Sequence, residues 1–280
     1  MLGQVEGSAR VTVGAAVTAG ADRLRRAGCD SPRLDAELLL ARTLGVDRAR
    51  LVMDRSEPLG GAAAAGFAAL LSRREAREPV AYILGRRDFR RITLHVDRRV
   101  LIPRPETELL VEVALELAPG ASVADVGTGS GAVALALADE RPDLMVTGLD
   151  IDPGALEVAR ANRARLGLEA RFRCADLLDE ERYDAVLANL PYVADGAGLA
   201  PEITDYEPAG ALFAGRDGLE VVRRLVTQVG ARSPRPALLG LEISPEQAPT
   251  TVALVRSAGY VTVLTHADLA GHARVVVGSA

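Results

Sequence analysis

Apolar residues over the first 78 positions recur with the spacing of an α-helix. Ser31 and Pro32 supply an N-cap and a first-turn proline, and Gly45 can end the same helix. Between them the apolar side chains fall on one helix face: Leu34, Leu38 and Ala41, with Leu39 and Leu40 widening the stripe. Asp47 can cap the helix that follows. We therefore expect a small all-helical N-terminal domain over residues 1–78.

Residues 79–103 follow the period of a β-strand. Ile92, Leu94 and Val96 alternate with polar residues, which is typical of a half-buried strand. We expect residues 100–102 to pair with this strand. The segment is therefore predicted to be a β-hairpin connector.

From residue 104 to residue 280, strand-like and helix-like patterns alternate. Strands are expected over 122–125, 144–150, 170–174, 183–188, 237–243, 260–266 and 273–277. The main helices are expected over 131–140, 153–166, 217–230 and 246–258. This alternation predicts an α/β fold with a doubly wound, mostly parallel, Rossmann-like sheet. The last two strands are joined by a short turn, so they should be antiparallel at an edge.

The first strand of this sheet runs into a glycine-rich turn that opens a helix: Gly127, Thr128, Gly129, Ser130 and Gly131. Glycines allow a tight turn and let a ligand approach main-chain N–H groups. In an open α/β sheet, ligands bind beyond the carboxyl ends of the strands. The turn is therefore the predicted cofactor site, and a glycine-rich turn without a ligand is the alternative.

Acidic residues follow the next two strands. Asp150 lies 23 residues after Gly127, and its two carboxylate oxygens can accept both hydroxyls of a ribose. Asp176 is a candidate partner for an adenine amino group. This pattern fits NAD as well as S-adenosylmethionine, because Gly127, Gly129 and Ala132 also satisfy the dinucleotide fingerprint.

The fourth strand ends in Asn189, Leu190, Pro191 and Tyr192, which favours methyl transfer over hydride transfer. The lone pair of an amide or exocyclic amino nitrogen is delocalised, so methylating it requires the NH₂ group to be held. Asn189 Oδ1 and the Leu190 carbonyl can each accept one N–H, and the Tyr192 ring can stack on the planar group. Pro191 restricts Leu190 to extended geometry. An ordinary Asn-x-Pro turn is the alternative.

The composition argues against a metalloprotein, a membrane-spanning protein and a secreted protein. Cys29 and Cys174 are the only cysteines, and none of the three histidines has a ligand-type residue at i+3 or i+4, so no metal site is expected. No apolar stretch is long enough to span a membrane, and the N-terminus lacks a secretory leader pattern. We expect a cytoplasmic protein that acts as a monomer.

All 33 basic residues are arginine, and they are unevenly spread. Residues 73–104 hold ten arginines against four acidic residues, a net charge of +6, which leaves −11 for the rest of a chain whose net charge is −5. Because the rest of the chain is so acidic, we expect it to bind nucleic acid poorly on its own. Two interpretations of the segment stay open: a salt-bridged surface, or a docking surface for an acidic partner.

Taken together, the chain resembles the release-factor glutamine methyltransferase family almost from end to end. The resemblance lies in residues 31–44, 79–85, 101–108, 189–192, 207–215, 217–219, 241–247 and 268–278. It implies S-adenosylmethionine at Gly127 to Gly131, with S-adenosylhomocysteine as product. It also places Asp150 on the ribose and Asp176 and Leu177 near the adenine. Asn189 is expected to contact the cofactor as well as the acceptor. The resemblance further implies that the glutamine of the Gly-Gly-Gln motif of a peptide chain release factor is gripped by Asn189 to Tyr192.

One position departs from the family pattern. Proline is usual where this chain has Leu190, and Asn-Leu-Pro-Tyr is the form common in rRNA adenine dimethyltransferases. The accepting carbonyl survives this change, but the φ restriction is lost. Two alternatives therefore remain: an adenine-amino methyltransferase acting on rRNA or DNA, and a non-catalytic protein that binds S-adenosylmethionine.

Overall fold

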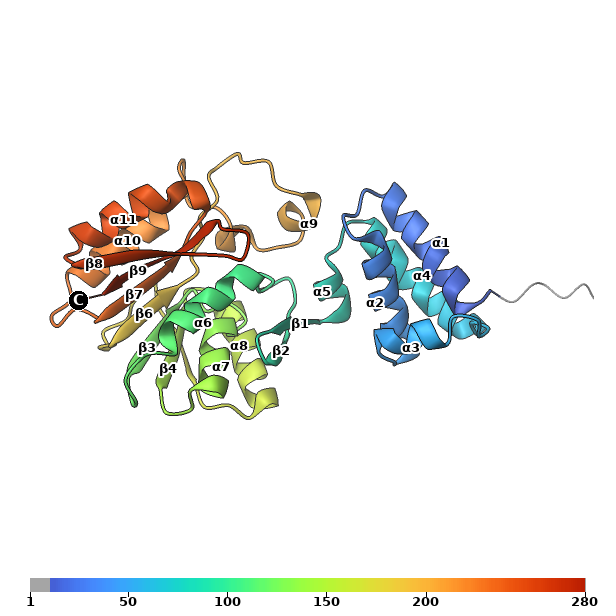
Figure 1. Ribbon diagram of the computed structural model, residues 1–280, viewed down its shortest axis with the longest axis horizontal. Helices are drawn as coiled ribbons and strands as arrows, with labels where there is room; N and C mark the ends of the chain where they lie inside the picture. The colour runs from blue at the N-terminus through green and yellow to red at the C-terminus, as the bar shows by residue number, and fades with distance from the viewer. Residues whose placement is uncertain (1–10, 280) are drawn as a thin grey trace, which may run out of the picture. The chain divides into compact units, whose positions relative to one another are not determined.

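The computed structural model describes residues 11–279, which form two compact units (Figure 1). The helical unit comprises residues 11–85 together with Pro201–Tyr206, and the sheet unit comprises Arg86–Ala200 and residues 207–279. The two units are defined by the contacts that their residues make within each unit. The domain boundaries predicted at 78/79 and 103/104 stay predictions.

The helical unit contains the helix predicted between Ser31 and Gly45 and the one predicted after Asp47. It also contains a helix over Val80–Leu84, which the sequence analysis did not expect within the hairpin connector. It contains α1 (Val13–Arg26), α2 (Pro32–Leu44), α3 (Arg48–Met53), α4 (Gly61–Glu75), α5 (Val80–Leu84) and the short α9 (Pro201–Thr204). Helix α2 starts with Pro32 in its first turn and ends at Gly45, which has φ +68°. The Asp47 side chain caps α3 by accepting from the Arg50 N–H at 2.8 Å. These predictions are confirmed.

A buried ion cluster holds the segment Pro201–Tyr206 in the helical unit. Arg74 on α4, only 6% exposed, donates from Nε to Asp35 on α2 at 2.8 Å and from NH2 to Glu202 at 2.9 Å. Arg77 donates to the other Glu202 oxygen at 2.5 Å. Burial raises the pKa of Asp35, and the hydrogen bond from Arg74 opposes that effect. The guanidinium of Arg74 therefore balances two carboxylates at once.

The sheet unit contains the predicted mostly parallel sheet. Its seven strands are β3 (Ser122–Val126), β4 (Met145–Asp150), β5 (Arg171–Cys174), β6 (Ala185–Ala188), β7 (Leu238–Glu242), β8 (Thr262–Ala267) and β9 (Ala273–Ser279). They lie in the order β5-β4-β3-β6-β7-β9-β8, and β9 is antiparallel to both neighbours. The predicted α/β fold with an antiparallel edge is confirmed. Val126 pairs with Leu149 on one side and Ala188 on the other, so β3, β4 and β6 end at the same edge.

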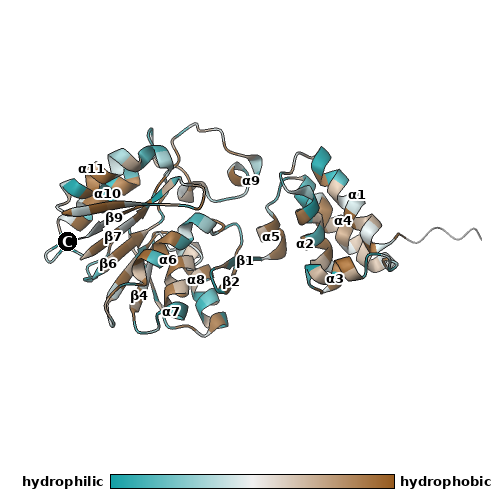
Figure 2. Ribbon diagram, viewed as in Figure 1, coloured by the Kyte–Doolittle hydropathy of each residue, from teal (hydrophilic) through white to brown (hydrophobic). Residues whose placement is uncertain are grey.

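Helices cover both faces of this sheet (Figure 1). They are α6 (Glu108–Ala114), α7 (Ala132–Glu140) and α8 (Pro153–Leu166) on one face, with α10 (Glu220–Gly230) and α11 (Ala248–Ser257) on the other. Leu239 and Leu241 join the apolar cluster of α10 and α11, whereas a Cβ at the intervening Gly240 would lie 3.4 Å from Leu110 of α6. Strands β6, β7 and β9 are accordingly mostly apolar, although β7 ends in Glu242 and β9 contains Arg274 (Figure 2). Within residues 11–279, the helices are too short or too polar to cross a membrane.

The hairpin forms, but with a different partner strand. Strand β1 (Arg86–Phe89) pairs antiparallel with β2 (Ile92–His95), so the prediction that residues 100–102 pair with β2 is wrong. A two-residue turn at Arg90, which has φ +49°, brings the buried Phe89 beside Ile92. The Ile102 N–H instead donates to the buried Glu207 side chain at 3.2 Å. Strand β2 pairs with β1 because the loop between them is short, and closing a short loop costs less conformational entropy.

Most arginines of the segment 73–104 form ion pairs with acidic side chains of the same chain. Six of its ten arginines pair with acidic side chains: Arg73, Arg74, Arg77, Arg90, Arg99 and Arg104. Several partners lie outside the segment, including Glu202, Glu140 and Glu207. The positive charge is therefore largely balanced locally, which favours the salt-bridged interpretation for these six residues.

Replacing Arg74 by methionine tests the buried cluster. We expect R74M to lower the free energy of unfolding by about 3–5 kcal/mol, because Asp35 and Glu202 would lose a buried counter-charge. The matched control is R73M, since Arg73 pairs with Glu78 near the surface and should cost less than about 1 kcal/mol. Urea unfolding followed by circular dichroism measures both. Equal losses in the two variants would contradict this account.

Candidate functional site

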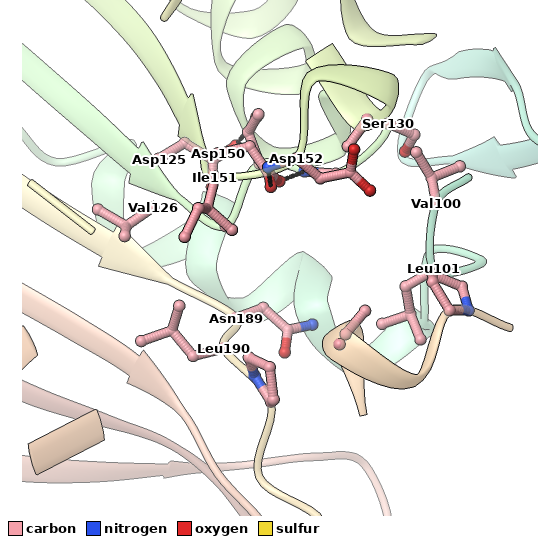
Figure 3. A pocket seen from close by; sticks show the side chains of 18 of the residues that line it. Val100, Leu101, Asp125, Val126, Ser130, Asp150, Ile151, Asp152, Asn189 and Leu190 are labelled. Carbon is pink, nitrogen blue, oxygen red and sulfur yellow. Dashed lines mark hydrogen bonds between the residues drawn. The ribbon is translucent and has the colours of Figure 1, made fainter. Parts of the chain in front are cut away.

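A cavity of about 320 Å³ opens at the edge of the sheet where β3, β4 and β6 end. Asp150, Ile151 and Asp152 line one side, Asn189 and Leu190 lie across from them, and Val100 and Leu101 close a third side (Figure 3). The predicted site residues that line it are Gly127, Thr128, Gly129, Ser130, Asp150, Asp176, Leu177, Asn189, Leu190 and Pro191. Gly131 and Tyr192 lie outside its lining. The fold thus brings both predicted motifs to one cavity.

The glycine loop takes a conformation that requires glycine. Gly127, Gly129 and Gly131 have φ values of +74°, +55° and +83°. The N–H groups of Gly127 and Thr128 both donate to the Leu149 carbonyl, at 2.8 and 3.0 Å, which ties the loop to β4. A Cβ at Gly129 would meet nothing nearer than 4.0 Å. A ligand can therefore approach the main chain closely at this point.

Asp125 holds the loop from below, a role that the sequence analysis missed. Its side chain is 2% exposed and accepts from the Thr128 hydroxyl at 2.6 Å and from the Ala134 N–H at 3.1 Å. Burial raises its pKa to about 6, although these hydrogen bonds favour the ionised form. Asp125 thereby connects the loop to the first turn of α7. An aspartate inside an otherwise apolar strand was the available signal.

Asp150 supports the loop from the side. One carboxylate oxygen accepts from the Gly129 N–H at 2.9 Å, and the other accepts from the Asp152 N–H at 3.0 Å. Burial raises the pKa of Asp150, and the backbone hydrogen bonds oppose that shift. A carboxylate has about four acceptor positions, so Asp150 keeps acceptor capacity for a further donor. Such an acceptor fits the hydroxyls of a ribose.

A strained turn follows β5 at the predicted adenine position. Asp176 pairs with Arg224 at 2.5 Å, and the buried Leu177 has φ +69°, which costs about 1–2 kcal/mol for a residue with a Cβ. Gln228 holds this turn, because its Oε1 accepts from the Leu178 N–H at 3.1 Å. Strain that the fold maintains beside a cavity is typical of a binding site.

The side chain of Asn189 extends from the end of β6 toward the cavity (Figure 3). Its Nδ2 donates to the Thr107 hydroxyl at 2.9 Å, which leaves Oδ1 as the acceptor for a ligand. Leu190 is buried below the glycine loop, with its Cδ2 3.2 Å from the position of a Cβ at Gly127. The motif Asn189–Tyr192 and the glycine loop, which were predicted as the catalytic and cofactor motifs, are therefore packed directly against each other.

Tyr192 is fixed at both ends. Its carbonyl accepts from Gln247 Nε2 at 2.9 Å, and its hydroxyl donates to Glu242 at 3.4 Å. A Cβ at Gly218 would lie only 2.1 Å from the Tyr192 carbonyl oxygen, so only glycine fits there. Stacking of the Tyr192 ring on an acceptor stays a prediction.

Sequence reasoning assigned no role to three polar residues around the motif. Thr107 holds Asn189, Glu242 accepts from Tyr192, and Glu207 accepts from Arg104 at 2.6 Å and from the Ile102 N–H. A glutamate ending the apolar strand β7 was a signal for Glu242. The described residues contain no cluster of acidic, cysteine or histidine side chains suited to a metal.

Family models match both units of the chain. The model described as the PrmC N-terminal domain matches residues 15–85, and the one described as the methyltransferase small domain matches residues 105–205. A release factor glutamine methyltransferase of Caulobacter vibrioides is 38% identical over 278 residues, which cover 96% of each chain. One of Mycolicibacterium smegmatis is 44% identical over 219 residues, covering 75% of this chain and 77% of that one. The resemblance predicted from the sequence is confirmed.

Solved structures share the fold. The hMettl16 catalytic domain in complex with MAT2A 3′UTR hairpin 6 has a TM-score of 0.57 at 16% identity, covering 75% of this chain and 81% of that one. A methyltransferase from Pyrococcus furiosus has a TM-score of 0.50 at 16% identity, covering 66% and 87%. At such identities the likeness concerns the fold alone.

Replacing Gly127 by alanine tests the close packing of the two motifs. The new Cβ would lie 3.2 Å from Leu190 Cδ2 and 3.3 Å from the Asn189 carbonyl oxygen, at φ +74°. The strain of about 1–2 kcal/mol should weaken binding of S-adenosylhomocysteine by roughly tenfold, as measured by calorimetry. G167A is the control, because Gly167 has φ +67° at the end of α8 and nothing within 4 Å of its Cβ position. Equal affinities for the two variants would refute the expectation.

Proposed function

Because this chain belongs to the release factor glutamine methyltransferase family, we propose that it transfers a methyl group from S-adenosylmethionine to the side-chain amide nitrogen of a glutamine in peptide chain release factors. The glutamine of the Gly-Gly-Gln motif is the acceptor that the sequence resemblance implies. The observation that carries the proposal is the position of Asn189, whose amide is held with Oδ1 free beside the cavity of the glycine loop. This reaction takes place in the cytoplasm, where release factors act.

The acceptor amide must be held because its nitrogen is a weak nucleophile. Asn189 Oδ1 and the Leu190 carbonyl each accept one N–H, which fixes the plane of the amide and directs the nitrogen toward the methyl donor. Bound S-adenosylmethionine supplies an electrophilic methyl group on a sulfonium. As the bond from nitrogen to the methyl carbon forms, the bond from that carbon to sulfur would break, and the hydrogen that the methyl group replaces would leave to water as a proton. The chain therefore contributes mainly orientation, and no strong base is required.

The residues around the cavity fit this cofactor. Asp150 keeps acceptor capacity for the ribose hydroxyls, and the loop at Gly129 leaves room for a ligand against its main chain. Asp176 and Leu177 would lie beside the adenine. Thr128 and Ser130, which also line the cavity, complete the cofactor side.

The charge distribution favours a protein acceptor over a nucleic acid. Arginines of the segment 73–104 are largely engaged in ion pairs within the chain, so they offer few free cations for a phosphate backbone. Methylation of an adenine amino group on rRNA or DNA is the competing function, because the Asn-Leu-Pro-Tyr form that contains Leu190 is common in rRNA adenine dimethyltransferases.

Mass spectrometry of labelled substrates decides between these acceptors. The purified protein is incubated with methyl-labelled S-adenosylmethionine and either a release factor or rRNA. We expect label on the release-factor glutamine and none on rRNA. N189A should abolish turnover and keep its affinity for S-adenosylhomocysteine within about threefold, because Asn189 acts on the acceptor. Label on an adenine alone would refute the proposal.

Leu190 can be exchanged for the proline usual in the family. L190P should keep turnover on the release factor within about threefold, since the accepting carbonyl remains. It should also lose roughly 1–3 kcal/mol of stability, because the buried δ-methyl groups are removed. L190A removes the same packing without restricting φ and serves as the control. A loss of turnover in L190P that exceeds the loss in L190A would show that the loop is adapted to another acceptor.

A further inference from the structure

We propose that Thr107 and Glu242 are positioning residues that fix the amide of Asn189 with its Oδ1 toward the acceptor. The proposal rests on the proposed methyl transfer, but concerns which side chains prepare the acceptor site. An asparagine amide has an accepting end and a donating end of nearly equal size. Only one of its two orientations can receive an N–H from a glutamine amide.

Thr107 makes the contact that selects this orientation. It is 4% exposed, ends the 3-10 turn Pro105–Thr107 and accepts from Asn189 Nδ2 at 2.9 Å. A hydroxyl has one hydrogen and can accept or donate. Thr107 alone could therefore hold either end of the Asn189 amide, so a further group must fix the direction of its hydrogen.

Glu242 supplies that direction. It ends β7, beside the strand that carries Asn189, and is only 2% exposed. The Tyr192 hydroxyl donates to its Oε1 at 3.4 Å, and a hydrogen bond from the Thr107 side chain also stabilises its ionised form. An ionised carboxylate only accepts, so it takes the Thr107 hydrogen. The Thr107 oxygen is then left to accept from Asn189 Nδ2, and Oδ1 faces the acceptor.

The direction of the Thr107 hydrogen depends on whether Glu242 is ionised, and the surroundings of Glu242 determine at which pH it ionises. Its pKa is raised to about 7, because the effects of burial and of the charge of Glu106 outweigh the hydrogen bonds from Thr107 and Tyr192 and the charge of Arg274, which lower it. Its Oε2 has no hydrogen-bond partner among the described residues. Tyr192 stays protonated in this range, because burial raises the pKa of its phenol. Once Glu242 is protonated, the Thr107 hydrogen is free to donate to Asn189 Oδ1, which would turn the amide the wrong way.

Two substitutions of Thr107 test the hydrogen bond. T107V keeps the volume and removes the hydroxyl, whereas T107S keeps the hydroxyl. We expect T107V to lower kcat/KM for the acceptor by at least about tenfold while the Kd of S-adenosylhomocysteine changes less than about twofold. T107S should stay within about threefold of the wild type. Equal activity of T107V and wild type, or equal losses in T107V and T107S, would overturn the proposal.

A pH profile tests Glu242. Wild-type kcat/KM should rise with pH through a range near 7, where Glu242 ionises, and E242Q should lack this rise. The same rise in E242Q would assign the titration to another group and refute the role of Glu242. All variants are assayed on the acceptor that mass spectrometry identifies. An adenine amino group needs the same Oδ1, so failure of the proposed function and failure of this proposal remain distinguishable.

Discussion

The binding end of the sheet depends on two carboxylates, the buried Asp125 and the half-buried Asp150, that accept from main-chain N–H groups. Asp125 binds the Ala134 N–H and the Thr128 hydroxyl, and Asp150 binds the N–H groups of Gly129 and Asp152. Burial raises the pKa of both, so each carboxylate is held at a cost that its hydrogen bonds offset. In return the glycine loop is already ordered before a cofactor binds, which reduces the entropy lost on binding.

Two segments far apart in the sequence support the proposed acceptor motif, and a third supports residues 102–104. Thr107 holds the side chain of Asn189, Gln247 holds the carbonyl of Tyr192, and Glu207 holds the chain at residues 102–104. Each contact is made by a buried polar side chain. The family resemblance outside the two motifs therefore has a physical basis, because Thr107 and Gln247 determine where the Asn189 amide and the Tyr192 carbonyl point.

Local signals in the sequence were sufficient for the helices and the sheet, but insufficient for contacts between distant segments. Helix α2 could be delimited because Pro32 and Gly45 act within one turn of its ends, and alternating periods identified the parallel sheet. The hairpin partner was wrong because β1 holds a single apolar residue, Phe89, after three charged ones, and so shows no strand periodicity. Thr107 and Glu242 could not be assigned a role, since their partners lie 82 and 50 residues away in the chain. The net charge of segment 73–104 likewise said little about its surface, because partners such as Glu140 and Glu202 come from outside it.

Leu190 shows how one constraint can replace another. A proline at this position would restrict φ of the residue whose carbonyl we propose to bind the acceptor. Here the leucine side chain is 5% exposed and lies beneath Gly127, within the apolar cluster that contains Val126 and Leu241. Packing of the Leu190 side chain restricts its backbone, as the ring of a proline would. Moving the Leu190 carbonyl would require the side chain to leave a close-packed core. The carbonyl is then fixed jointly with the glycine loop, so the acceptor and cofactor sites are held by one core.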